Sequence, residues 1–235
     1  MQSSWPHILE FLYGVAAVIN TKLNCPLCEG IEGSSYYFSD INREYYRCSQ
    51  CKLITVPPIH YLSLEDERAE YDKHQNSPED EGYRKFLSRL FIPLNSNLKS
   101  GSYGLDFGSG PGPTLSVMFE EAGYKMSLYD PFYATDKNVL NKQYDFITAT
   151  EVLEHLHDPA KEVDLLWSLL KPGGWLGVMT KLALDKEAFS KWHYKDDPTH
   201  VCFFSKETMD WLALKWKTNA LYFGKDVILF QKWEY

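Results

Sequence analysis

The chain is built around the segment Leu105-Asp106-Phe107-Gly108-Ser109-Gly110-Pro111-Gly112-Pro113, in which three glycines stand at alternate positions. Glycines at this density cannot fill a core, so we expect them to serve the backbone. Glycine adopts positive φ angles and lets a ligand approach the main chain closely. A turn that leads from a strand into a helix also points unpaired N–H groups at such a ligand. The segment therefore predicts a nucleotide cradle, and a Gly/Pro-rich surface turn is the alternative.

The glycine spacing distinguishes two kinds of nucleotide loop. A dinucleotide-binding loop carries glycine at its first, third and sixth positions. Counted from Gly108, the sixth position is Pro113 and the fifth is Gly112, which disfavours a nicotinamide oxidoreductase. The pattern Asp-x-Gly-x-Gly-x-Gly instead resembles motif I of the class I S-adenosylmethionine-dependent methyltransferases. This resemblance implies that Asp106 lies near the amino acid end of the cofactor and that the loop residues Gly108, Ser109, Gly110 and Gly112 line it.

From Gly101 onward, strand-like and helix-like segments alternate, as a parallel sheet requires. The expected strands are 103–107, 125–129, 144–150 and 175–180, with a very short third strand over 138–140. The expected helices are 114–122, 160–170 and 206–216, and the segments 220–223 and 227–231 are expected to form a hairpin at Gly224-Lys225. The fold class is therefore α/β, a Rossmann-like doubly wound sheet with an antiparallel last strand.

The second strand ends in Asp130-Pro131-Phe132. An acidic residue at this strand tip, about twenty positions after the first glycine, is placed to accept hydrogen bonds from ribose hydroxyls. Asp130 takes that role, and we expect Pro131 and Phe132 to border the cofactor, with Phe132 against the adenine. A plain strand-ending Asp-Pro turn is the alternative.

Two further motifs strengthen the resemblance. The segment Glu151-Val152-Leu153-Glu154-His155 follows the 144–150 strand, and LLKPGGWL precedes the 175–180 strand. Both resemble methyltransferases akin to the ubiquinone-biosynthesis C-methylases, and the resemblance covers residues 101 to about 205. It implies that Thr150 and Glu151 also contact the cofactor.

Two histidines are candidates for a general base. His155 stands one helical turn from Glu151, whose carboxylate could orient the imidazole or raise its basicity. His200 lies in the 192–204 stretch, which follows the last parallel strand at the edge of the sheet where ligands bind. The alternatives are a histidine that only binds the neighbouring loop and a stretch that only packs in the core. Methyl transfer needs a base only when the nucleophile carries a proton at neutral pH.

Near the start of the chain, Cys25/Cys28 and Cys48/Cys51 form two C-x-x-C pairs separated by 19 residues. This spacing predicts a zinc ribbon in which four thiolates hold one structural zinc. A redox-active pair is the alternative, but such a motif opens a helix, and neither pair is expected to do so. Glu29 and Lys52 stand where ribbon knuckles often have glycine, which weakens the argument for knuckle geometry.

Charge argues against a nucleic-acid substrate. The chain of 235 residues has a net charge of −8, so a phosphate backbone would repel it unless basic residues were segregated. The ribbon region has no such surplus, because its four basic residues are balanced by four acidic ones: Lys22, Arg43, Arg47 and Lys52 against Glu29, Glu32, Asp40 and Glu44. We therefore expect a small-molecule acceptor.

The rest of the chain gives the expected domain organisation: a segment 1–20 with an apolar helical pattern, the ribbon at 21–58, a helical cap at 59–100 and the cofactor-binding domain at 101–235. In the cap, Tyr71 and His74 share one helical side and could reach the cofactor, although a solvated helix edge is equally compatible. The apolar run near the start is too short to span a bilayer and no basic residue precedes it. We expect no membrane partner and a cytoplasmic location.

The sequence as a whole predicts a methyltransferase that uses S-adenosyl-L-methionine, releases S-adenosyl-L-homocysteine and carries a structural zinc. The alternatives are an RNA- or protein-modifying methyltransferase that uses the ribbon for target binding, and a cofactor-binding scaffold without catalysis. The acceptor atom and the oligomeric state are not indicated by the sequence.

Overall fold

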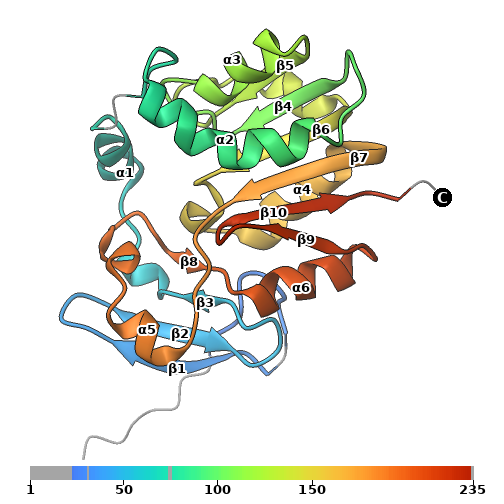
Figure 1. Ribbon diagram of the computed structural model, residues 1–235. Coiled ribbons are helices and arrows are strands. Elements are labelled where there is room, and N and C mark those ends of the chain that lie inside the picture. Colours follow the sequence, from blue (N-terminus) through green and yellow to red (C-terminus); the bar gives the residue numbers. More distant parts are fainter. Residues whose placement is uncertain (1–22, 31, 74–75, 234–235) are drawn as a thin grey trace, which may run out of the picture.

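The computed structural model describes residues 23–30, 32–73 and 76–233, and these residues form two sheets (Figure 1). The segment 1–20, predicted to be helical, and His74 lie outside the described residues. The larger sheet has six strands in the order β5 (Lys125–Tyr129), β4 (Tyr103–Phe107), β6 (Tyr144–Thr150), β7 (Leu170–Met179), β10 (Val227–Gln231) and β9 (Ala220–Phe223).

The direction of the strands confirms the expected fold class. Strands β5, β4, β6 and β7 are parallel, and β10 joins β7 antiparallel. Strands β9 and β10 form the predicted hairpin, whose turn contains Gly224 at φ 64°. The structure is thus a Rossmann-like α/β fold with an antiparallel end.

Helices cover both faces of this sheet (Figure 1). On one face, α2 (Glu81–Asn95) and α3 (Thr114–Glu121) enclose a core with Phe119, Phe146 and Leu229. On the other face, α4 (Pro159–Leu169) and α6 (Lys206–Lys215) pack on the larger core. The apolar side of α2 predicted from its spacing is buried, with Leu87 and Leu90 nearly inaccessible.

Two local predictions are wrong. Residues 138–140 form part of the 3-10 helix η2 (Lys137–Asn141) instead of a third strand, because the Asp136 side chain caps the segment at the amide of Asn138. The segment Ser77-Pro78-Glu79-Asp80, with a capping serine, a proline and two acidic residues, also predicts a helix start. Helix α2 instead begins at Glu81, where the Asp80 carboxylate accepts from the amide of Tyr83. Ser77 instead stands in the preceding turn, where its carbonyl accepts from the amide of Asp80.

The smaller sheet combines distant parts of the chain. Its order is β1 (Ser34–Ser39), β2 (Glu44–Cys48), β3 (Ile54–Thr55) and β8 (Cys202–Phe203). The β8 strand pairs antiparallel with β3, and one hydrophobic core runs from Cys25 and Tyr45 to residues of the large sheet. The region predicted as a ribbon therefore shares its core with the rest of the molecule, and the domain division at residue 58 stays a prediction.

The remaining elements are short and lie mostly near the carboxyl edge of the large sheet. They are η1 (Pro58–His60), α1 (Leu64–Tyr71), η3 (Leu153–His155), α5 (Lys186–Ser190) and η4 (His193–Asp196). Helix α1 is capped by the Ser63 hydroxyl and stands beside the edge at which β4 and β7 end (Figure 1). It ends at Tyr71, earlier than the predicted 64–74 helix.

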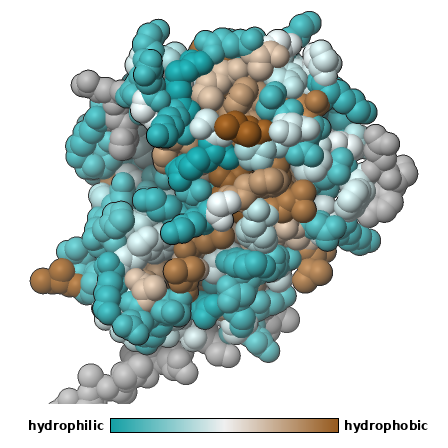
Figure 2. Space-filling model, viewed as in Figure 1, coloured by the Kyte–Doolittle hydropathy of each residue, from teal (hydrophilic) through white to brown (hydrophobic). Residues whose placement is uncertain are grey.

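The surface in Figure 2 is mainly hydrophilic, and its apolar side chains form separate patches. Such patches are ordinary for a folded protein surface. Among the residues described, no helix has both the length and the apolar character needed to cross a membrane.

A buried glycine in β4 gives a test of the core. A Cβ at Gly104 would lie 2.3 Å from Cζ of Phe146 and 2.7 Å from Sδ of Met126. We expect Gly104→Ala to lower the free energy of unfolding by about 1–3 kcal/mol, because overpacking forces these side chains to shift. The measurement is urea denaturation.

The matched control is Gly82→Ala in the exposed first turn of α2. Alanine is the better helix former by about 1 kcal/mol, so this variant should be neutral or more stable. Equal destabilisation by both substitutions would contradict the packing explanation.

Candidate functional site

The glycine loop joins β4 to α3 and adopts the strained backbone that its glycines allow. Gly108 has φ 72° and Gly110 has φ 62°. A Cβ at Gly108 would lie 2.4 Å from Val152, and one at Gly112 would lie 2.1 Å from the carbonyl oxygen of Asn76. A Cβ at Gly110 would meet nothing within 4 Å. The loop is thus packed closely at both ends and open at Gly110.

Asp106, which the resemblance places near the cofactor, is 4% exposed in the structure. One carboxylate oxygen accepts from Ser116 at 3.0 Å and the other from Thr148 at 2.7 Å. Burial raises the pKa of Asp106 to about 6, although these two hydrogen bonds act to lower it. Its side chain thus links β4, the strand that leads into the loop, to β6 and to α3.

Asp130 lies at the tip of β5 and ties the glycine loop to the turn after that strand. Its Oδ2 accepts from the amide of Gly110 at 2.9 Å. Its Oδ1 accepts from the amides of Phe132 and Tyr133. A carboxylate oxygen can accept more than one hydrogen bond, so these contacts leave acceptor capacity for a ligand hydroxyl.

Unsatisfied polar atoms gather at this edge of the sheet. Among the described residues, five buried side-chain N or O atoms have no hydrogen-bond partner, and three of them belong to Ser109, Thr150 and Glu151. These residues follow β4 or end β6, which are adjacent parallel strands. Buried polar atoms without partners are rare in folded proteins. They mark a place where a polar ligand would complete the hydrogen bonding.

Glu151 is the most strained of these residues. It has φ 51°, a conformation that costs free energy for a residue with a side chain. Burial, together with the charge of nearby Glu154, raises the pKa of Glu151 to about 8. Strain and an unsatisfied carboxylate at one position are typical of a functional site.

Aromatic rings line the same edge. The ring of Tyr71 lies 5.7 Å from that of Phe132 and 5.3 Å from that of His155. The structure therefore brings together Tyr71 from α1, Phe132 from the turn after β5 and His155 from η3. Tyr83 was predicted only as a helix-face residue, but its pKa, raised by burial to about 12, also responds to the charges of Asp106 and Glu151. Its position on the apolar face of α2 did not distinguish it from a core residue.

The two candidate bases lie against each other. The ring centroids of His155 and His200 are 4.7 Å apart. Nδ1 of His155 lies 3.2 Å from the Thr199 carbonyl oxygen, and Nδ1 of His200 lies 2.7 Å from that of Tyr194. A carbonyl oxygen only accepts, so Nδ1 of each ring carries a proton and donates it. Burial lowers the pKa of His200, which keeps its ring neutral.

Glu154 lies beneath the histidines and is fully buried. Its carboxylate accepts from the hydroxyls of Thr180 and Tyr194. Burial raises the pKa of Glu154, although the nearby His200 and the Tyr194 hydrogen bond act in the opposite direction. The sequence predicts that the Glu151 carboxylate could orient the His155 imidazole. In the structure, a carboxylate oxygen of Glu154 lies within 4.8 Å of a ring nitrogen of both His155 and His200.

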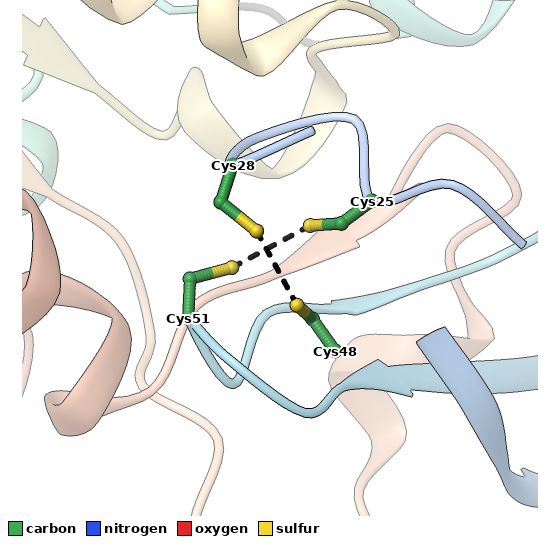
Figure 3. Close-up of side chains that lie close together, drawn as sticks. All are labelled: Cys25, Cys28, Cys48 and Cys51. Atoms are coloured by element: carbon green, nitrogen blue, oxygen red, sulfur yellow. Dashed lines mark hydrogen bonds between the residues drawn. The ribbon is translucent and has the colours of Figure 1, made fainter. Parts of the chain in front are cut away.

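The four cysteines predicted as metal ligands converge on one point (Figure 3). The Sγ atoms of Cys25 and Cys51 are 3.5 Å apart, and those of Cys28 and Cys48 are 3.4 Å apart. These distances are far too long for a disulfide bond. Tetrahedral zinc with Zn–S bonds of about 2.3 Å requires sulfur–sulfur distances of roughly 3.8 Å. The two distances are somewhat shorter than this, and all four sulfur atoms lie within 4.8 Å of one another, close enough to share one metal ion.

The backbone around the cysteines has the form of two knuckles. Glu29 has φ 51° and Lys52 has φ 63°, so both adopt the left-handed conformation that glycine usually provides after a second cysteine. The amide of Gln50 also donates to Sγ of Cys48 at 3.3 Å. The absence of glycine at these two positions therefore does not prevent the knuckle conformation.

A family model described as a methyltransferase domain matches residues 71–216, the part that contains the glycine loop, Asp130 and the two histidines. The chain belongs to this family. Its similarity to class I S-adenosylmethionine-dependent methyltransferases, inferred from motif I, agrees with this match and with the strand order of the methyltransferase fold.

Curated relatives of this methyltransferase domain include two ubiquinone biosynthesis O-methyltransferases. The one from Marinobacter nauticus is 34% identical over 86 residues, which are 33% of this chain and 33% of that protein. The one from Colwellia psychrerythraea is 30% identical over 95 residues, 40% of this chain and 37% of that protein. The chain thus matches little more than a third of the length of these relatives.

Solved structures similar to the methyltransferase domain include two methyltransferases with bound S-adenosylhomocysteine. The 1,6-didemethyltoxoflavin-N1-methyltransferase of Burkholderia thailandensis has a TM-score of 0.48 and 13% identity, covering 85% of this chain and 99% of that chain. The magnesium protoporphyrin IX methyltransferase of Synechocystis has a TM-score of 0.49 and 11% identity, covering 72% and 94%.

The raised pKa of Glu151 predicts a pH-dependent effect on the stability of the methyltransferase domain. The usual pKa of 4.5 rises to about 8 in the folded protein, so folding favours the protonated form. The penalty is absent below about pH 4.5 and increases up to about pH 8. Glutamine is neutral throughout. Glu151→Gln should therefore raise the free energy of unfolding by about 1–3 kcal/mol at pH 7, and by little at pH 4.5.

Urea denaturation at pH 4.5, 6, 7 and 8 measures this difference. Glu120→Gln, on the exposed side of α3, is the control and should leave the pH dependence as it is. A Glu151→Gln effect that is the same at every pH would show that the carboxylate is not desolvated.

Proposed function

We propose that this protein is an enzyme that transfers the methyl group of S-adenosyl-L-methionine to a small-molecule acceptor and releases S-adenosyl-L-homocysteine. The observation that carries the proposal is the set of buried, unpartnered oxygens of Ser109, Thr150 and Glu151 beside the open face of Gly110. A nucleoside with an amino acid tail offers hydroxyl, amine and carboxylate groups to such a site. Family membership supports the same reaction.

The residues at the edge of the sheet fit the cofactor. The loop residues Gly108, Ser109, Gly110 and Gly112 would hold the amino acid tail, with Asp106 supporting the loop. Asp130 would accept from the ribose hydroxyls, with Pro131 and Phe132 beside the adenine. Thr150 and Glu151 would close the site from β6, and Tyr71 from α1. Burial disfavours the charged form of the carboxyl groups at this edge, and a ligand with an ammonium and a sulfonium group would stabilise it.

The bound cofactor supplies an activated methyl group, and the chain must align the acceptor with it. Such alignment can contribute several kcal/mol to catalysis. We assign His155 and His200 as candidate bases that remove the proton of the acceptor. Nδ1 of each imidazole donates to a backbone carbonyl, and burial lowers the pKa of His200, which keeps that ring unprotonated near neutral pH.

The acceptor is proposed to be a small molecule methylated on oxygen. The matched relatives are named as O-methyltransferases, and an imidazole base suits a hydroxyl acceptor, whose proton must leave. The net charge of −8 disfavours a nucleic acid.

The region 21–58 is proposed to be a zinc ribbon. Cys25, Cys28, Cys48 and Cys51 would complete a tetrahedral shell and leave no position for water, so the metal would be structural. Within the predicted cap 59–100, α1 would cover the cofactor, whereas α2 packs on the face of the large sheet.

Gly110 provides the sharpest test of the cofactor site. Gly110 and Gly123 both have positive φ, and at neither position would a Cβ meet an atom within 4 Å. Alanine at either position should cost about 1–2 kcal/mol of stability. Only Gly110→Ala should also weaken binding of S-adenosylhomocysteine, by tenfold or more, because its methyl group would occupy the open face of the cradle.

Isothermal calorimetry with S-adenosylmethionine, S-adenosylhomocysteine and NAD measures these affinities. Gly123→Ala is the matched control for backbone strain and should bind like the wild type. Equal affinities for the wild type and Gly110→Ala would place the ligand elsewhere, and preferential binding of NAD would exclude a methyl donor.

Single-turnover labelling with methyl-labelled cofactor and fractionated cell extract tests the acceptor. Label in small molecules supports the proposal. Label in RNA or protein would establish the modifying methyltransferase instead, and cofactor binding without any labelling would indicate a scaffold.

The zinc ribbon predicts one zinc per chain by elemental analysis. Removing the metal with a strong chelator should lower the melting temperature by several degrees, because the four thiols lose the ion that holds them together. Cys48→Ser should contain less zinc than the wild type, whereas Cys202→Ser, which alters a cysteine outside the cluster, should retain it. Full zinc content in Cys48→Ser would refute the assignment.

A further inference from the structure

Arg43 is a buried arginine that the proposed reaction does not use. It lies between β1 and β2 in the ribbon region and is 8% exposed. A buried guanidinium is costly unless its N–H groups find acceptors. The hydrogen-bond acceptors of the Arg43 guanidinium lie in the loop that carries His200.

The guanidinium donates to four backbone carbonyl oxygens within residues 195–200. Nη1 contacts the carbonyl of His200 at 2.9 Å and that of Pro198 at 3.3 Å. Nη2 contacts the carbonyl of Asp197 at 2.9 Å and that of Lys195. One guanidinium group thus binds the carbonyl groups of Lys195, Asp197, Pro198 and His200 together.

Neighbouring ribbon residues support this arrangement. Asp40 accepts from the amide of Arg43 at 2.9 Å and from Nζ of Lys195 at 3.0 Å. The hydroxyl of Tyr45 lies 3.3 Å from the Lys195 carbonyl oxygen. The amide of Val56 also donates to the carbonyl of Val201 at 3.1 Å, just beyond the loop.

The loop in turn orients both imidazoles. Its Thr199 carbonyl accepts from Nδ1 of His155, and the Tyr194 carbonyl at its start accepts from Nδ1 of His200. The amide of Val201 donates to the carbonyl of Glu154 at 2.8 Å. Movement of this loop would therefore change the tautomer and direction of both rings together.

We propose that Arg43 is a positioning residue of the methyl-transfer site, which fixes the 195–200 loop and through it the direction of His155 and His200. The proposal rests on the proposed function for the role of the imidazoles. In this proposal the ribbon region holds in place the loop that borders the acceptor side of the site. Lysine cannot replace Arg43, because one ammonium lacks the planar fork that reaches several carbonyls.

The test is ¹⁵N NMR of the imidazole groups in the full chain, as wild type and as Arg43→Lys. In the wild type we expect both rings as neutral Nδ1–H tautomers at pH 7. In Arg43→Lys we expect mixed tautomers and a His200 pKa closer to its ordinary value, because the loop admits water. The groups that face His200 and share its titration are Glu154, His155, Tyr194 and Asp197.

Arg47→Lys is the matched control. Arg47 belongs to β2 and forms an ion pair with Glu207 at 3.7 Å. The Arg47→Lys variant should have the same imidazole signals and the same affinity for S-adenosylhomocysteine as the wild type. Arg43→Lys should also bind S-adenosylhomocysteine within about threefold of the wild type, since the cradle residues are not among its contacts.

Unchanged tautomers and an unchanged His200 pKa in folded Arg43→Lys would overturn the proposal. If that variant does not fold, Arg43→Gln, whose amide keeps two of the N–H donors, takes its place, and faster amide exchange across 195–200 than in Arg47→Gln is then expected. Equal exchange would overturn the proposal in that case. Failure of the wild type to bind the cofactor would instead refute the proposed function, because the imidazole signals report on the loop independently of any ligand.

Discussion

The parallel register of β4 with its two neighbours determines where the glycine loop and the residues at the ends of β5 and β6 lie. Phe107 pairs with Tyr129 on one side, and Asp106 pairs with Thr148 on the other. The three strands therefore end at one edge, where the amides of Gly108 and Ser109 both approach the carbonyl oxygen of Tyr129. Because backbone hydrogen bonds fix this register, the glycine loop, Asp130 and Thr150 meet without any direct contact between distant side chains being required.

Local signals were sufficient to predict this edge from the sequence. The glycine spacing, the acidic residue at the tip of β5 and the alternation of strands and helices each depend on neighbouring residues. The prediction of a strand at 138–140 was wrong because it followed the strand order expected for the family. The local signal was the Asp136 cap, which indicates a helix start.

Contacts between distant segments could not be predicted in the same way. Nothing near Cys202 and Phe203 indicates that they extend the sheet of the ribbon region. The role of Arg43 depends on carbonyl groups more than 150 positions away, and every residue type has a carbonyl. The knuckle positions show a further limit: Glu29 and Lys52 adopt positive φ although neither is glycine, because the surrounding fold outweighs the local preference, at about 1–2 kcal/mol each.

The carboxyl groups at the site have an electrostatic consequence. Burial raises the pKa of Asp106, Glu151 and Glu154, and Glu151 and Glu154 also repel each other. Without a ligand, burial therefore favours the neutral, protonated form of these carboxyl groups. A cationic ligand would lower these pKa values and be stabilised in return. Loss of positive charge from that ligand would remove the attraction. A site of this kind would bind a sulfonium more tightly than the neutral thioether formed from it, and would so favour release of the thioether.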